Sequence, residues 1–311
     1  KTNFRMGVLV GPVLAFSICA CSTGDNGGGG EEPVYRSFVY VANFGSISDS
    51  VLGSISAFAM NASTGALTAV TGSPFAVGGI FTSIACDPAR KYAYVAAASN
   101  GVLDGPGDVS GFAVNKVTGA LTAVPGSPFT AGQGTFSVAV DPTGHYLYAT
   151  NFDSNDITAY AINAATGALS AVAGSPFADG GPGRELPGPT GLAVLPSGKF
   201  ACVAHYYAYD ISVLAIDAAT GTLTDIAGSP FATEYGSYGL TVDPTGRFVY
   251  VADYGNDSVS AYAIDATTGV LTTVAGSPLR PASSGGSSRR RWLTAARAAA
   301  ASVSGGGVRR P

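Results

Sequence analysis

The sequence predicts an all-β fold assembled from repeated units, because one phrase recurs five times along its 311 residues. The phrase is Asn/Asp-x-x-Thr-Gly-x-Leu followed by Gly-Ser-Pro-Phe or Gly-Ser-Pro-Leu, and its first copy runs from Asn61 to Phe75. The Thr-Gly pair returns after 54, 48, 54 and 48 residues, and a period of about 40–50 residues is typical of propeller blades. The 43 glycines and the charged fraction of 12% also fit a turn-rich β fold. We therefore expect a β-propeller of about five visible four-stranded blades.

Residues 1–21 have the pattern of an export signal. Lys1 and Arg5 precede an apolar run from Met6 to Ala20, which is too short to span a bilayer as a helix but suits the core of a signal peptide. The run closes on Ile18-Cys19-Ala20-Cys21, which resembles a bacterial lipobox. That resemblance implies lipidation of Cys21 and a lipid-anchored protein of the bacterial outer membrane or periplasm. Ordinary secretion is the alternative.

Residues 22–33 are expected to form a flexible Gly-rich linker, and residues 34–279 the propeller. Within the propeller, Asp141-Pro142-Thr143-Gly144 suits a type I turn, because Asp bonds forward to the backbone, Pro presets φ and Gly closes the turn. The unit around this turn predicts strands over residues 137–140, 146–151, 157–162 and 168–172.

Residues 280–311 are expected to be a disordered, low-complexity tail. They are rich in Arg, Ala and Gly, and they show neither apolar alternation nor a turn signature. Blade one begins at its second strand, so its closing strand is expected from the C-terminal side. The tail offers no such strand, and the predicted ring is therefore open or imperfectly closed.

The charge pattern argues against nucleic acid as a partner. Residues 22–279 hold seven basic and twenty acidic side chains, whereas phosphate neutralisation needs a basic face. The cysteines do not form a disulfide framework. Cys86 and Cys202 occupy positions filled by valine and tyrosine in other repeats, so both are expected to be buried apolar residues.

A short motif also recurs in the second strand of each repeat. It reads Tyr40-Val41-Ala42-Asn43, Tyr94-Val95-Ala96-Ala97, Tyr148-Ala149-Thr150-Asn151, Cys202-Val203-Ala204-His205 and Tyr250-Val251-Ala252-Asp253. On these residues the chain resembles the YVTN-repeat β-propellers, and more broadly the seven-bladed lactonase family that includes 6-phosphogluconolactonase-like proteins. The resemblance covers roughly residues 34–279 and implies a truncated seven-bladed propeller. It is specific for the fold, and a fold does not fix a function.

Loop lengths indicate which face of the propeller carries function. The turn between strands one and two and the Asn/Asp turn between strands three and four keep a constant length. The connections on the opposite face, between strands two and three and between blades, differ by six residues from blade to blade. Functional loops vary more than scaffold turns, so we expect a ligand-binding site on this variable face. Its candidate residues are Asn43, Asn151, Asp210, Glu234, Tyr235, Tyr238 and Asp253.

Two classes of function fit these residues. The favoured one is a binding or scaffold module in the cell envelope, whose ligand is a glycan, a small molecule or an envelope protein. The alternative is a sugar-lactone hydrolase, with His205, Arg184 and Glu185 as acid/base and anion-binding groups.

The resemblance itself weakens the second class. Enzymes of the lactonase family typically carry Gly-Pro-Arg-His before the first strand and Asn-Glu after the second. The nearest match here is Gly188-Pro189-Thr190-Gly191, and no second strand is followed by Asn-Glu. No cofactor or metal is expected, because the sequence has no nucleophile elbow, phosphate-binding glycine loop or paired Cys/His spacing.

Overall fold

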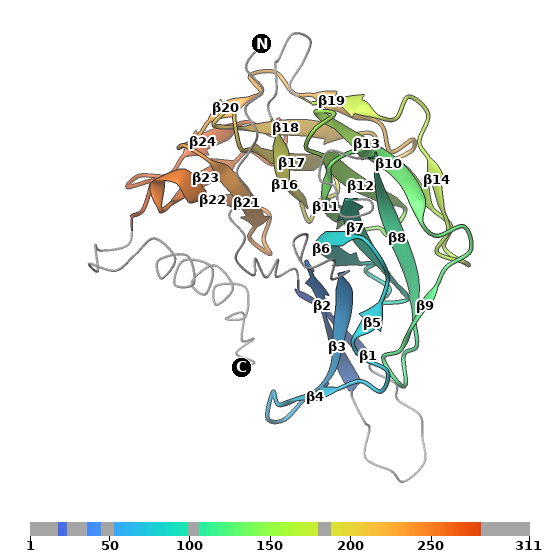
Figure 1. Ribbon diagram of the computed structural model, residues 1–311. Coiled ribbons are helices and arrows are strands. Elements are labelled where there is room, and N and C mark those ends of the chain that lie inside the picture. Colours follow the sequence, from blue (N-terminus) through green and yellow to red (C-terminus); the bar gives the residue numbers. More distant parts are fainter. Residues whose placement is uncertain (1–17, 24–35, 45–52, 99–105, 180–187, 281–311) are drawn as a thin grey trace, which may run out of the picture.

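The computed structural model describes residues 18–23, 36–44, 53–98, 106–179 and 188–280. These residues form five antiparallel sheets that follow one another in chain order around a common axis (Figure 1). The inner strands β6, β11, β16 and β21 contact one another in sequence, so each sheet is one blade. The arrangement confirms the predicted β-propeller.

Each blade runs from an inner strand beside the axis to short strands at the rim. Blade one contains β1 (Ile18–Thr23), β2 (Arg36–Asn43), β3 (Ser54–Asn61), β4 (Leu67–Ala69) and β5 (Phe75–Ala76). Blade two contains β6 (Ile80–Cys86), β7 (Tyr92–Ala98), β8 (Pro106–Val114), β9 (Leu121–Ala123) and β10 (Phe129–Gln133). Blade three contains β11 (Thr135–Val140), β12 (Tyr146–Asn151), β13 (Asp156–Ile162), β14 (Leu169–Ala171) and β15 (Phe177–Ala178).

The last two blades repeat this order. Blade four contains β16 (Pro189–Val194), β17 (Phe200–His205), β18 (Asp210–Ile216), β19 (Leu223–Asp225) and β20 (Phe231–Ala232). Blade five contains β21 (Ser237–Val242), β22 (Phe248–Asp253), β23 (Ser258–Ile264) and β24 (Leu271–Thr273), with the 3-10 turn η2 (Tyr254–Asn256) between β22 and β23. In blade five Leu279 forms an isolated bridge to Val259, at the place of the missing fifth strand.

The outer strand of a blade is split into two segments, which the sequence did not predict. In blade three both β14 and β15 pair with β13, and Gly174-Ser175-Pro176 lies between them. The Ser175 hydroxyl accepts a hydrogen bond from the amide of Ala159 at 2.9 Å, where the backbone ladder is interrupted. The serines of the other four copies do the same at 2.8–3.0 Å. The serine is therefore part of the sheet, which explains its recurrence.

The other half of the phrase forms the predicted turn. The Asn61 Oδ1 atom accepts hydrogen bonds from the amides of Ser63 and Thr64 at 3.0 and 2.9 Å, and Gly65 has a φ of 70°. The side-chain cap satisfies the loop amides, and glycine adopts the left-handed conformation without a Cβ penalty.

Blade one differs from its prediction. Its innermost strand is β1, which pairs antiparallel with β2 from the N-terminal side, not from the C-terminal side. This strand lies within the segments predicted as signal peptide (residues 1–21) and linker (22–33), and those boundaries stay predictions. Residues 281–311 of the predicted tail lie outside the described residues.

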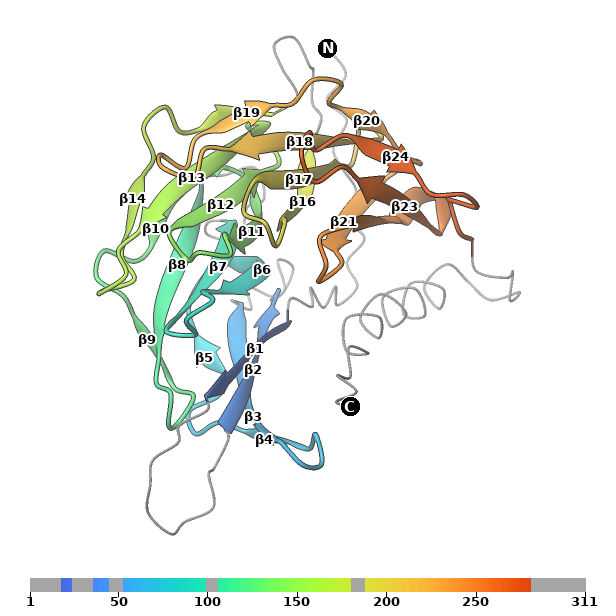
Figure 2. The same cartoon turned by 180° about the vertical axis from the view of Figure 1, so that it is seen from behind.

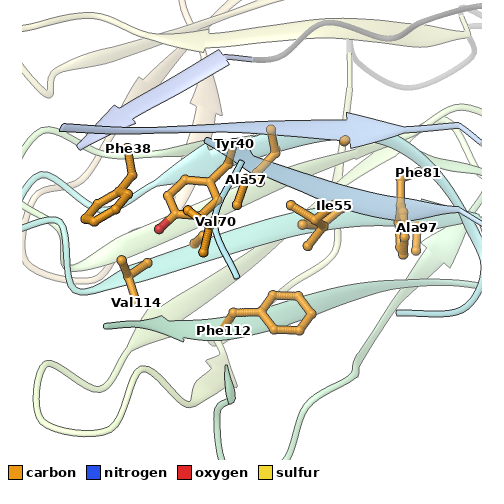
Figure 3. Packing of buried hydrophobic residues seen from close by; sticks show 13 residues of the cluster. Phe38, Tyr40, Ile55, Ala57, Val70, Phe81, Ala97, Phe112 and Val114 are labelled. Carbon is orange, nitrogen blue, oxygen red and sulfur yellow. The ribbon is translucent and has the colours of Figure 1, made fainter. Parts of the chain in front are cut away.

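The cores of the propeller lie between blades. Four apolar clusters fill the four contacts between successive blades, and each cluster takes side chains from both of its blades. Figure 3 shows the first cluster, in which Phe38, Tyr40 and Ile55 of blade one face Phe112 and Val114 of blade two. A single blade has no enclosed core, so its faces need neighbours to be buried.

A polar contact accompanies three of these clusters. The hydroxyl groups of Tyr40, Tyr94 and Tyr148 each donate to the carbonyl of the Thr-Gly glycine in the next blade, at 2.9, 2.9 and 3.1 Å. The aromatic residue two positions before each of these tyrosines packs against the same glycine. A Cβ atom added at Gly119 would lie 2.4 Å from the ring of Phe38. Glycine is therefore required here both for its φ and for this close approach.

The described residues form an open ring of blades. In Figures 1 and 2 the described parts of blade five (orange) and blade one (blue) lie at opposite ends of an arc, without a blade between them. This agrees with the expected imperfect closure.

The cysteines only partly follow the prediction. Cys202 is fully buried and free, and burial raises the pKa of its thiol to about 12. Cys86 is only partly buried and is disulfide-bonded, so the prediction of a buried apolar residue is wrong at this position.

The tyrosine–glycine bond leads to a stability prediction. Replacing Tyr148→Phe removes the donor and leaves the Gly221 carbonyl without it at a buried contact, which costs about 1–3 kcal/mol. The control is Tyr250→Phe, because no described residue accepts a hydrogen bond from the equivalent hydroxyl in blade five. Urea unfolding in dilute solution should show a loss for the first variant only. Equal losses would contradict the role assigned to this bond.

Candidate functional site

The ends of the second strands carry buried polar side chains on the variable face. Asn151 closes β12 and is fully buried. Its amide nitrogen donates to Asp156 and Thr158 at 2.6 and 2.8 Å, and its oxygen accepts from Thr135 at 3.0 Å. The side chain thus joins the first three strands of blade three, and each of its hydrogen bonds is intramolecular.

Asp253 holds the same position in blade five. Its two carboxylate oxygens accept from Ser237 at 3.0 Å and Ser260 at 2.6 Å. Burial raises the pKa of Asp253, although the two serine hydroxyls oppose that shift. In blade one, the Asn43 amide donates to Ser54 and Ser56, each at 2.9 Å. These three predicted ligand-binding residues therefore link neighbouring strands of their own blades by side-chain hydrogen bonds, an arrangement that we call a clamp.

Blade four has a charged version of this clamp. His205 is fully buried, and its Nδ1 lies 2.8 Å from Asp210 while its Nε2 lies 2.6 Å from Asp179. Asp210 begins β18 of the same blade, whereas Asp179 follows β15 of blade three. The histidine therefore fastens the connection between two blades as well as its own blade.

Two carboxylates decide the charge of this histidine. Burial by itself lowers the pKa of His205, but the adjacent Asp179 and Asp210 outweigh burial and raise the pKa to about 9. At neutral pH the ring is an imidazolium held between two carboxylates. Because both nitrogens of an imidazolium carry protons, and each here faces a carboxylate, the ring has no lone pair to take a proton from a substrate. Arg184 and Glu185, the other predicted catalytic residues, lie outside the described residues.

Aromatic rings form a continuous group on the same face. Contacts run from Phe136 to Phe152 and on through Tyr207 and Tyr206 to Tyr254, with ring centroids 5.1–6.5 Å apart. Tyr238 touches three of these rings at 5.4–6.4 Å, and such distances are typical of favourable aromatic pairs. We call this group the aromatic platform; its members are Phe136, Phe152, Tyr206, Tyr207, Tyr238 and Tyr254.

The platform spans blades three, four and five, and its members differ in exposure. Tyr207 and Tyr254 are exposed, whereas Tyr206 and Tyr238 are partly buried. Burial raises the pKa of Tyr206 and Tyr207, and that of Tyr238 to about 12, so all three stay neutral at physiological pH. The platform therefore offers apolar ring faces together with neutral hydroxyl groups.

Glycines allow these rings to approach the backbone closely. A Cβ at Gly188 would lie 2.9 Å from Tyr207 and 3.0 Å from Phe152. A second ring pair flanks the platform, where Tyr209 and Tyr235 meet at 4.9 Å between centroids and a Cβ at Gly255 would collide with Tyr235. Both Tyr209 and Tyr235 are exposed.

The remaining predicted residues lie around these rings. Tyr235 belongs to the flanking pair and Tyr238 to the platform, and their predicted role in ligand binding stays a prediction. Glu234 is partly buried, accepts a 2.5 Å hydrogen bond from Asn256 and forms a 3.3 Å ion pair with Arg280. The sequence did not single out Phe136, Phe152, Tyr207 or Tyr254.

A sequence signal for the platform did exist. The residue after the second strand is Phe44, Phe152, Tyr206 or Tyr254 in four of the five blades. The recurrence of an aromatic residue at a loop position is visible in the sequence. Contact between rings from different blades becomes apparent only in the fold.

Charge is distributed unevenly between the two faces. We call the face opposite the variable one, where the turns keep a constant length, the fixed face. Among the described residues, the turns between strands one and two on this face carry four basic side chains: Arg90, Lys91, Lys199 and Arg247. A depression of about 100 Å³ on that face is lined by Asp87, Lys91, Thr143 and His145 among others. The variable face instead carries Asp153, Asp257 and Glu234 near the rings. In the described ranges, no group of His, Cys, Asp and Glu has the arrangement of a metal site.

Five blades around one axis, with an aromatic face on the side where the loops vary, define this protein as a β-propeller. Residues 102–283 match the family described as lactonase, 7-bladed beta-propeller. The chain therefore belongs to the lactonase family of seven-bladed β-propellers. Its described residues form five blades. Curated protein sequences gave no significant match.

Solved structures support the fold. A functionally unknown protein from Desulfotomaculum acetoxidans has a TM-score of 0.60 at 17% identity, over 76% of this chain and 65% of that one. A putative 6-phosphogluconolactonase from Bacteroides uniformis has a TM-score of 0.58 at 15% identity, over 78% and 82%. A periplasmic gluconolactonase from Pseudomonas aeruginosa has a TM-score of 0.50 at 18% identity, over 79% and 85%.

The histidine clamp predicts how stability depends on pH. The pKa of His205 is about 9 in the fold and about 6.5 in an unfolded chain. Its contribution is therefore complete below about pH 6.5 and is lost as the pH rises towards 9, by up to about 3 kcal/mol. Unfolding free energies measured between these two pH values should fall in the parent chain. The fall should be absent in His205→Gln, smaller in Asp179→Asn, which keeps Asp210, and unchanged in His145→Gln. A flat profile in the parent would refute the clamp.

Proposed function

We propose that this protein is a non-catalytic binding propeller whose aromatic platform takes a neutral carbohydrate. The observation that supports the proposal best is the continuity of six rings across three blades, with Tyr207 and Tyr254 exposed. Aromatic rings of this kind are rigid, so they provide contact area at little cost in conformational entropy.

The chemistry of a sugar suits these rings. One face of a pyranose ring presents C–H groups, which pack against an aromatic face, while its hydroxyl groups bond at the edge. Tyrosine serves both needs, because its ring is apolar and its hydroxyl is polar. The carboxylates of Asp153 and Glu234 lie beside the platform, where they can accept hydrogen bonds from sugar hydroxyls. Binding sites commonly combine apolar walls with a few such polar groups.

Electrostatics favours a neutral ligand over a phosphorylated one. Most described basic side chains lie on the fixed face, Arg280 is paired with Glu234, and the His205 imidazolium is buried between Asp179 and Asp210. A phosphate group on the variable face would approach Asp153 and Glu234, whose like charge repels it. A phosphosugar is therefore the less favourable ligand for this surface.

Calorimetric titration with a panel of neutral oligosaccharides tests the proposal. At least one should bind, and Tyr207→Ala and Tyr254→Ala should each weaken binding about tenfold, because an exposed ring at the centre of a contact is worth about 1–2 kcal/mol. Val117→Ala is the matched control, since Val117 is exposed on the fixed face. A panel without any binder, or equal affinities in all variants, would contradict the proposal.

Lactone hydrolysis is the second candidate, and membership of the lactonase family favours it. Against it stands the engagement of both His205 nitrogens by carboxylates. Hydrolysis of gluconolactone should stay at the spontaneous rate when the protein is added. A clearly faster rate that falls in His205→Ala would replace the binding function with catalysis.

We also propose that the protein is exported and anchored to the envelope by lipid at Cys21, or otherwise secreted. The lipobox-like ending of the signal sequence supports this location, and so does the likeness to a periplasmic protein. Within the described ranges, no helix has the length and apolar character needed to cross a bilayer. Fractionation of cells producing Cys21→Ala should move the protein out of the membrane fraction, and unchanged partitioning would rule out the lipid anchor.

A further inference from the structure

The exposed tyrosines of the described residues all lie on the variable face. Each has 43–47% of its surface accessible, and they are Tyr207, Tyr209, Tyr235 and Tyr254. They belong to three loops of blades four and five, namely β17–β18, β20–β21 and β22–β23. Tyr207 and Tyr254 are members of the aromatic platform, whereas Tyr209 and Tyr235 form the flanking pair. The exposed rings therefore extend beyond the platform itself.

Tyr209 has a backbone conformation that tyrosine rarely adopts. Its φ is 55°, in the left-handed region, which is unfavourable for a bulky side chain. The equivalent loop positions in blades three and five hold Asn155 and Asp257, with φ values of 55° and 50°. Asparagine and aspartate tolerate this region, so only blade four of these three places a ring there. Backbone strain of this kind concentrates at functional sites.

The contacts of the Tyr209 ring do not account for this strain. In blade three the Asn155 Oδ1 atom accepts a hydrogen bond from the Gly188 amide at 3.0 Å, which ties the loop to the connection between blades. Tyr209 instead meets Tyr235 of the next connection, with ring centroids 4.9 Å apart. Because both rings remain exposed, their contact buries little apolar surface. A ligand that covers both rings would supply the missing burial.

Backbone hydrogen bonds connect the flanking pair with the platform. The Thr233 amide donates to the Tyr209 carbonyl at 2.9 Å, and the Gly255 amide donates to the Tyr235 carbonyl at 3.1 Å. Gly255 directly follows the platform residue Tyr254, and a Cβ at Gly255 would collide with the Tyr235 ring. The two groups of rings are therefore adjacent, on loops that are bonded to one another. Such preorganised loops lose little conformational freedom when a ligand binds.

We infer that the ligand is an oligosaccharide chain that binds across the platform and the flanking pair together. This inference rests on the proposed carbohydrate function and specifies the size of its ligand. A pyranose is a single six-membered ring, which is too small to cover four exposed tyrosine rings. Tyr207 and Tyr254 therefore contact one part of the chain, and Tyr209 and Tyr235 contact a neighbouring part. Contacts made by one chain at two adjacent sites reinforce one another.

Calorimetric titration with a chain-length series tests this inference. The series runs from the disaccharide to the hexasaccharide of the neutral sugar that binds best. Affinity should rise by about tenfold or more along it, and a disaccharide that binds too weakly to detect counts as such a rise. The informative variant is Tyr209→Asn, because asparagine suits the left-handed conformation and the change removes the ring without adding strain. It should weaken hexasaccharide binding about tenfold and leave disaccharide binding unchanged.

Three further variants separate the possible outcomes. Tyr235→Ala should repeat the effect of Tyr209→Asn, whereas Tyr207→Ala, in the platform, should weaken binding of the short and the long chain alike. Val117→Asn changes an exposed residue of the fixed face and should bind like the parent. Affinity independent of chain length, or hexasaccharide binding unaffected by Tyr209→Asn and Tyr235→Ala, would overturn this inference and leave the proposed function standing. A series in which no saccharide binds would overturn both.

Discussion

The structure depends on the contact between successive blades. In this contact a tyrosine hydroxyl meets a glycine carbonyl, and a neighbouring ring lies on the same glycine. All four apolar clusters combine side chains of two blades. The stabilising burial therefore belongs to pairs of blades, as it does in other repeat architectures. The fixed lengths of the turns follow from this, because a longer Thr-Gly turn would move the glycine away from its ring.

The loops of the variable face are not held to a fixed length. They do not take part in the tyrosine–glycine contact, so their length and sequence are free to differ. Polar side chains such as Asn151 and His205 close the strand ends beneath them. These hydrogen bonds hold the strand ends in place, and the platform residues Phe152 and Tyr206 directly follow Asn151 and His205 in the sequence. The rigid interior thus makes a variable surface possible without loss of the fold.

Much of this architecture could be predicted from the sequence. The second strand of blade three was predicted over residues 146–151, which are the bounds of β12. Alternation and turn residues are local signals, so they predict strands and caps well. The split outer strand was missed because its second segment, such as Phe177–Ala178, has only two residues. The inner strand β1 was missed because its sequence also fits an export signal.

The site was predicted less completely, for a physical reason. The variable face was inferred from loop lengths, and the structure places Tyr235 and Tyr238 among its aromatic rings; their role in binding a ligand stays a prediction. The partners of His205 could not be predicted, because Asp179 lies 26 residues earlier and belongs to the preceding blade. Ring contacts such as that between Phe136 and Tyr238 likewise join residues that are distant in sequence. Such contacts depend on the angle between blades, which the repeat pattern does not contain.

Amide hydrogen exchange in dilute solution tests the central claim most directly, namely that neighbouring blades and not single blades carry the stability. The second strands β2, β12, β17 and β22 have the same ladder of partners on both sides. Among the described residues, β12 and β17 belong to blades with a neighbouring blade on both sides, whereas β2 and β22 belong to blades with a neighbour on one side. The account predicts slower exchange in β12 and β17 than in β2 and β22. Equal protection in all four strands would show that each blade is stable by itself and would contradict it.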